Sequence, residues 1–153
     1  MPTLDDVYRK FGETSEAAQL LETELGNILL LTGAIAAGIL ENPDAAKAKE
    51  LFNFIDRQTL GQLLKSLNRS TDSLAALESL LSRALKERNR LSHSFYREYN
   101  FRRNSDEGRA LMLKDLESIH DVVLEAYKEV MRLSGMDLDK MRSAALPTGH
   151  LPI

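Results

Sequence analysis

The chain contains no cysteine and no tryptophan, and only four of its 153 residues are proline. The absence of cysteine excludes disulfide bonds, thiolate metal ligands and a cysteine nucleophile. It also fits a reducing compartment, so we expect a cytoplasmic protein. The prolines stand at positions 2, 43, 147 and 152, and long helices can therefore form in the middle of the chain.

Long apolar runs are also lacking. The longest covers residues 28–40 and is interrupted by Thr32, Gly33 and Gly38, whereas a bilayer-spanning helix needs about 20 apolar residues. The N-terminus is acidic and has no apolar run of the secretory kind, so we expect no membrane association. A helix that is apolar on all sides is buried in a core or in a subunit interface, and the sequence leaves both open for residues 28–40.

Neither sign of charge dominates strongly, because the formal net charge is −3. Between Arg83 and Arg109, however, eight basic residues stand with four acidic ones, a local balance of +4 that leaves −7 on the remainder of the chain. A local positive zone can attract a polyanion. The ordinary alternative is a solvated helix surface of mixed charge.

What the chain does contain is helical periodicity. β-branched residues are sparse and no alternating strand pattern persists, so the sequence predicts an all-α protein. We expect an up-down helical bundle of four to five helices over residues 1–135, followed by an extended tail over residues 136–153 that contains two prolines.

The limits of the helices follow from apolar spacing and capping residues. We expect helices over about 4–11, 15–40, 45–54, 59–67, 71–99 and 106–133. Gly12 should end the first helix, Asp44 and Ser105 should cap the helices that follow them, and Gly135 should stand just after the last helix. The inward-facing residues of that last helix are expected to be Leu111, Leu113, Leu116, Ile119, Val122, Val123, Ala126, Tyr127 and Val130.

A candidate chemical site lies in the hexapeptide that runs from Arg88 to His93. Asn89 and His93 are four residues apart and share a helix face. If the helix continues, Tyr96 and Arg97 extend the same strip, edged by the long side chain of Arg88.

The chemistry of these side chains suits RNA cleavage without a metal. Histidine transfers protons near neutral pH, arginine binds phosphate and stabilises the charge that grows on it, and asparagine can orient either group. The 2′-hydroxyl of RNA would attack the adjacent phosphate. One helix supplies a single acid–base group, whereas two copies at a dimer axis supply two. The alternative is a chance pairing, because a lone helical histidine is more often a surface or packed residue than a catalyst.

Four of the chain's nine aromatic residues follow the hexapeptide and interleave with arginines. Such mixtures stack bases and hold phosphates. Packing of the helix end is the alternative, which we expect for Phe95 and Phe101. Arg90 is either a phosphate contact or a simple surface charge. The predicted RNA-binding residues are Arg90, Tyr96, Arg97, Tyr99, Arg102 and Arg103.

The hexapeptide resembles the signature of the HEPN superfamily, in which four to six residues separate an arginine from a histidine and a polar residue, often asparagine, follows the arginine. Arg88, Asn89 and His93 match it with four intervening residues. The motif also stands near the C-terminal end of the penultimate long helix, as in HEPN domains. Residues 59–63 look like a segment common in HEPN-like proteins.

The resemblance covers roughly residues 20–133 and implies a helical bundle, a symmetric homodimer and a composite cleft that holds Arg88, Asn89 and His93 of both copies. Many HEPN proteins are endoribonucleases of toxin–antitoxin, phage-defence or abortive-infection systems, which implies RNA as substrate and a cognate antitoxin or nucleotidyltransferase as partner. Some HEPN toxins carry a tyrosine two residues after the histidine, where that nucleotidyltransferase modifies them. In this chain the residue two positions after His93 is Phe95. This difference weakens the assignment to a toxin paired with a nucleotidyltransferase.

Other members of the superfamily are inactive binding domains. The alternative function is therefore a non-catalytic helical dimer that acts as an antitoxin, a regulatory subunit or an adaptor. No cofactor is expected, since three dispersed histidines without cysteine form no recognisable metal set and the chain has no phosphate-binding loop.

Overall fold

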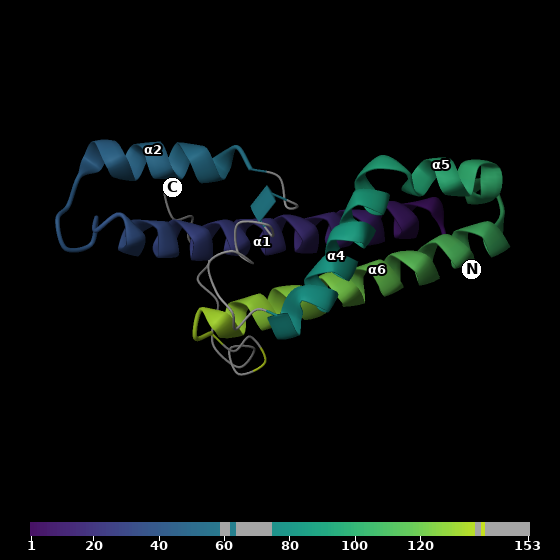
Figure 1. Cartoon of the computed structure of the whole chain (residues 1–153). Helices are drawn as coiled ribbons and strands as arrows, with labels where there is room; N and C mark the ends of the chain where they lie inside the picture. The colour runs from purple at the N-terminus through teal and green to yellow at the C-terminus, as the bar shows by residue number, and fades with distance from the viewer. Residues whose placement is uncertain (59–61, 64–74, 137–138, 140–153) are drawn as a thin grey trace.

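The computed structural model describes residues 1–58, 62–63, 75–136 and 139. Over these residues the protein is a helical bundle without strands, which confirms the all-α prediction (Figure 1). The predicted helix over residues 59–67, the start of the helix near residue 71 and most of the predicted tail lie outside the described residues. The elements are α1 (Leu4–Ala36), α2 (Ala45–Asp56), α4 (Ala75–His93), α5 (Phe95–Tyr99), the 3-10 helix η2 (Asn100–Asn104) and α6 (Asp106–Leu133).

Helix α1 is continuous, so the expected break at Gly12 is wrong. It begins at a capping box between Thr3 and Asp6. A glycine inside a helix costs only about 1 kcal/mol, and buried Val7 and Thr14 lie on either side of Gly12 in the part of α1 that packs on α6. Packing against α6 therefore carries the helix through the glycine.

The C-terminal end of α1 also differs from the prediction. The helix ends at Ala36 instead of residue 40, because Gly38 adopts a left-handed backbone with φ of +66°. The Gly38 amide donates to the Ile35 carbonyl, and the Ile39 amide donates to the Ala34 carbonyl. This pair of bonds is the common glycine-dependent stop signal of helices.

Helices α1, α4 and α6 form the core of the bundle. Arg109, near the start of α6, donates to the carbonyl of Pro2, just before α1. Ser134, just after α6, donates to Glu24, far along α1. Helices α1 and α6 therefore run in the same direction. Figure 1 shows α4 crossing them in the opposite direction. The corner formed by the end of α4, α5 and η2 therefore lies beside the beginnings of α1 and α6.

The limits of α6 agree with the prediction at both ends. Ser105 accepts a hydrogen bond from the Gly108 amide at 3.1 Å, and Gly135 follows the helix with φ of +78°. Within the helix, Leu111 is half exposed and Met112 is fully buried, so the expected inward position of Leu111 is wrong. Six of the buried positions are Met112, Leu116, Ile119, Val123, Ala126 and Val130, which keep the spacing of one helix face; Gly108 and Met131 are also buried.

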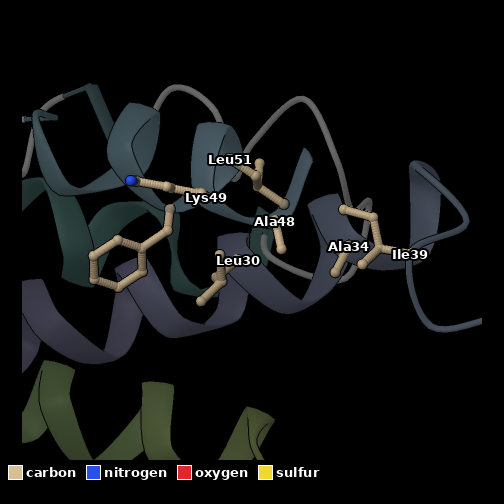
Figure 2. A pocket seen from close by; sticks show the side chains of 7 residues that line it. Leu30, Ala34, Ile39, Ala48, Lys49 and Leu51 are labelled. Atoms are coloured by element: carbon tan, nitrogen blue, oxygen red, sulfur yellow. The ribbon is translucent and has the colours of Figure 1, made fainter. Parts of the chain in front are cut away.

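Helix α2 begins at Ala45 with Asp44 as its N-cap, as predicted, and packs on the C-terminal half of α1. Figure 2 shows Leu30 and Ala34 of α1 facing Ala48 and Leu51 of α2 across a small apolar pocket. Helix α2 does not cover all the apolar side chains of this region. Five large ones are more than half exposed: Leu31, Ile35, Leu40, Phe52 and Phe54. No helix in the described ranges is both long and apolar enough to cross a bilayer.

Candidate functional site

The helix that carries the hexapeptide ends at His93. Ser94 leaves helical geometry with φ of −134° and ψ of −14°, and its hydroxyl donates to Glu98 Oε1 at 2.7 Å. The expected continuous helix to residue 99 is therefore wrong, and α5 leaves in a new direction (Figure 1). Tyr96 and Arg97 do not continue the helix face of Asn89 and His93.

Arg88 and Asn89 are brought together. The Arg88 Nη1 group donates to Asn89 Oδ1 at 3.1 Å, while Arg88 Nε lies 2.6 Å from Glu22 Oε1 on α1. Both partners of the ion pair are mostly covered. The guanidinium is thus held between an amide of its own helix and a carboxylate of the neighbouring one, which fixes its position relative to α1.

His93 is the exposed last residue of α4. Within the described part of the chain, its ring forms no hydrogen bond and no ion pair. It lies one helical turn after Asn89. The predicted site contains one histidine per chain, so a second acid–base group would have to come from another copy.

Arg90 is the centre of an ion-pair network. It donates to Glu87 Oε2 at 3.1 Å, to Glu98 Oε2 at 3.0 Å and to both oxygens of Asp115 at 2.5 and 2.8 Å. Burial opposes its charge, but the bond to Glu87 and the charges of the three carboxylates outweigh burial and raise the pKa of Arg90. A phosphate could reach this guanidinium only in competition with three bound carboxylates.

Tyr99 belongs to the same network. Its hydroxyl donates to Asp115 Oδ2 at 2.8 Å, and its ring packs on buried Phe95 with centroids 5.0 Å apart. Burial and the hydrogen bond to Asp115 raise the pKa of Tyr99 to about 12. Arg90, Asp115 and Tyr99 therefore tie the corner between α4 and α5 to α6.

Tyr96 packs inward on the beginning of α1. Its ring lies 5.0 Å from that of Phe11 and 6.2 Å from that of Tyr8. Burial raises the pKa of Tyr96, Tyr8 adds to the shift and the charge of Arg103 partly offsets it. The partly buried ring is thus engaged in packing against the core.

The three remaining predicted RNA-binding residues, Arg97, Arg102 and Arg103, are exposed. Among the described residues, none of their guanidinium groups forms a hydrogen bond or an ion pair. Between them stands Phe101, which is 77% exposed, so the expected packing of this ring is wrong, whereas that of Phe95 is confirmed.

Sequence reasoning missed the carboxylates that organise the site. Glu22 and Asp115 lie on other helices, and no local spacing links them to Arg88 and Arg90. Glu98 stands eight residues from Arg90, which is too far for a helix neighbour, and contacts it only because the chain turns at Ser94. Lys114, which lines an open recess with Arg102 and Asp115, was also missed.

No group of three or more histidine, aspartate or glutamate side chains in the described ranges is placed to hold a metal ion. Compared with protein-family models, with curated proteins and with solved structures, the chain matches none.

Proposed function

We propose that this protein is a metal-independent endoribonuclease of the HEPN type that acts as a homodimer. The observation that carries the proposal is the placement of His93, exposed and without a bonded partner in the described chain, one turn after the joined Arg88 and Asn89. The resemblance of this hexapeptide to the HEPN signature supplies the reaction class. A toxin–antitoxin or phage-defence setting belongs to the same proposal, with an antitoxin or nucleotidyltransferase as partner.

The reaction balances with protein groups alone. One His93 accepts the proton of the 2′-hydroxyl, whose oxygen forms a bond to phosphorus. The bond from phosphorus to the 5′-oxygen breaks, and the His93 of the second copy donates a proton to that oxygen. Arg88 stabilises the charge on the phosphate, and Asn89 orients the guanidinium. The products are a 2′,3′-cyclic phosphate and a free 5′-hydroxyl.

The dimer is supported by apolar surface that the single chain leaves uncovered. Leu31 and Ile35 are four residues apart on α1, share a helix face, and are 56% and 58% exposed. Neighbouring exposed apolar side chains can form an interaction site. We propose that a second copy covers this face and that the contact continues along α1 to the end of α4, because the two His93 side chains can meet only if the interface reaches that part of the bundle.

The central experiment compares wild-type protein with His93→Ala on single-stranded RNA in the presence of EDTA. We expect wild type to yield cyclic-phosphate ends and the variant to lose a factor of about 10² to 10⁴ in cleavage rate. Equal cleavage by both proteins, with an unchanged far-UV circular dichroism spectrum, would remove His93 from the chemistry.

Arg88 needs a matched control, because its substitution also breaks the ion pair with Glu22. Arg88→Gln and Glu22→Gln remove the same pair, and only the first removes the guanidinium. We expect similar small losses of stability, about 0.5–1 kcal/mol for a partly exposed pair, and loss of cleavage in Arg88→Gln alone. Equal loss of cleavage in both would show that Arg88 acts through the packing of α4 on α1.

The composite cleft is tested by Ile35→Glu. This variant should be monomeric by light scattering, keep its helix content and lose RNA cleavage. A monomeric variant that cleaves normally would contradict the composite cleft.

A second function, a non-catalytic helical dimer that serves as an antitoxin, regulatory subunit or adaptor, is favoured by one observation. Arg88 is already engaged by Glu22 within its own chain, so its charge is partly compensated before any phosphate binds. This function predicts a dimer that Ile35→Glu disrupts and no cleavage that depends on His93.

A further inference from the structure

The η2 turn presents its aromatic side chain to solvent. Phe101 is the most exposed of the nine aromatic residues, although Phe95 and Tyr99, which precede it, are packed into the corner. An aromatic ring contributes much to stability when it is buried, and Phe101, which is 77% exposed, contributes little of this within the chain. Its ring is therefore accessible to a ligand.

The backbone beneath this ring is held in place. Asn100 takes a left-handed φ of 45°, which side chains rarely adopt, and so directs the chain into η2. The Arg103 carbonyl accepts a hydrogen bond from Arg109 Nη1 at 3.0 Å, and the Arg102 carbonyl accepts one from the Ser105 amide at 3.1 Å. A ligand on Phe101 would thus bind a preformed turn and would not have to order one.

The turn also carries cations that form no ion pair among the described residues. The segment of α5 and η2 carries three arginines and one acidic residue, Glu98, which Arg90 and Ser94 already engage. Arg102 lines an open recess together with Lys114 of α6, and within the described chain neither side chain forms an ion pair. The two carboxylates of this recess, Glu98 and Asp115, are both bound by Arg90. Positive charge beside an exposed ring is suited to phosphates that flank a stacked base.

We propose that η2 is a binding site for single-stranded RNA, in which one base stacks on Phe101 while Arg102 and Lys114 hold the adjacent phosphates. Single-stranded RNA fits better than a duplex, because a ring can stack only on a base whose face is free. An anionic membrane fits less well, because a membrane-binding helix presents a row of apolar side chains, and α5 and η2 expose a single aromatic ring. The inference rests on the proposed function only for the identity of the polyanion as RNA.

The chain contains no tryptophan, which permits a direct test. Phe101→Trp, placed in the His93→Ala background so that RNA stays intact, gives a protein with a single tryptophan at the site. Phe54→Trp in the same background is the matched control, because Phe54 is also a well-exposed phenylalanine, on α2. Both are titrated with single-stranded RNA of about 12 nucleotides, within the range of roughly 4–16 that such sites cover, with the matching duplex, and with phosphatidylserine vesicles.

We expect single-stranded RNA to quench the tryptophan at position 101 and to leave that at position 54 unchanged. By fluorescence anisotropy, Phe101→Ala should weaken binding about tenfold, as expected for the loss of one stacked base. Arg102→Gln should weaken binding and lower its salt dependence, while Arg57→Gln, which removes an exposed arginine of the α2 end, should do neither.

The inference is overturned if RNA fails to quench the tryptophan at position 101, if Phe101→Ala binds within twofold of its parent, or if only vesicles or the duplex give the response. These outcomes are separate from the fate of the proposed function. Cleavage that depends on His93 together with normal binding by Phe101→Ala would reject the η2 site alone, and RNA binding at Phe101 without cleavage would reject the nuclease alone.

Discussion

Gly108, in the first turn of α6, lies directly against the backbone of η2. Its substitution should therefore disturb the placement of η2. A Cβ atom at this position would lie 2.6 Å from the carbonyl carbon and 2.9 Å from the Cα of Arg102, and closer still to the carbonyl oxygen. These are backbone atoms, which cannot rotate away as the end of a side chain could. Gly108→Ala must therefore push η2 away from the first turn of α6.

The expected magnitude combines two opposing effects. Alanine in place of glycine inside a helix stabilises by up to about 1 kcal/mol, whereas overpacking of a filled site costs about 1–3 kcal/mol. Because the clash involves backbone, we expect the second effect to prevail by about 1–2 kcal/mol. A shift of that size lowers the melting temperature by roughly 2–8 °C in a chain of this length.

Gly12 provides the matched control, since it lies inside α1 with no atom within 4 Å of an added Cβ. Gly12→Ala should stabilise the protein by about 0.5–1 kcal/mol. Urea unfolding followed by circular dichroism would measure both variants. If Gly108→Ala proves as stable as wild type, the close approach of η2 to α6 does not exist as described. If it is destabilised and still binds RNA normally, the position of η2 does not matter for binding.

Two further predictions concern the network around Asp115. Asp115→Asn should destabilise the protein by about 1–2 kcal/mol in the same urea experiment. This is less than the roughly 3–5 kcal/mol typical of a fully buried pair, because both Arg90 and Asp115 are partly exposed. Glu98→Gln, at the more exposed pair, should cost under about 1 kcal/mol, and a larger loss in Glu98→Gln than in Asp115→Asn would refute this order. The pKa of Tyr99 is raised to about 12 from about 10 in an unfolded chain, so the stabilisation from its neutral hydroxyl is complete below about pH 10 and is lost as the pH rises toward about 12. The difference in unfolding free energy between wild type and Tyr99→Phe should therefore shrink above about pH 10, and a constant difference would contradict the described environment of Tyr99.

Local signals predicted those parts of the fold that depend on local chemistry. Both ends of α6 follow from Ser105 and Gly135, whose hydrogen bonds are made within a few residues. The same reasoning was wrong at Gly12, where a weak local preference opposes the packing of α1 on α6. It was also wrong at Ser94, where the backbone leaves helical geometry and contacts with α1 and α6 decide the direction of α5.

The candidate site shows the same division. The sequence indicated Arg88, Asn89 and His93 through their spacing on one helix. It could not indicate the partner of Arg90, because Asp115 lies 25 residues away on α6. It also predicted that Tyr99 binds RNA and that Phe101 packs against the bundle, whereas Tyr99 donates to Asp115 and Phe101 is exposed.

In the proposed enzyme, the cations that would attract RNA and the residues that would cleave it lie on different helices. Of the eight basic residues between Arg83 and Arg109, carboxylates engage Arg88, Arg90 and Arg109, while the three arginines of α5 and η2 form no ion pair among the described residues. In the proposed enzyme, we therefore assign attraction of a polyanion to α5 and η2, and acid–base chemistry to the end of α4. If both proposals hold, Phe101→Ala should raise KM with little change in kcat, and His93→Ala should lower kcat with little change in RNA affinity. A substitution in either group that altered both parameters equally would show that the end of α4 and η2 act on RNA as one surface.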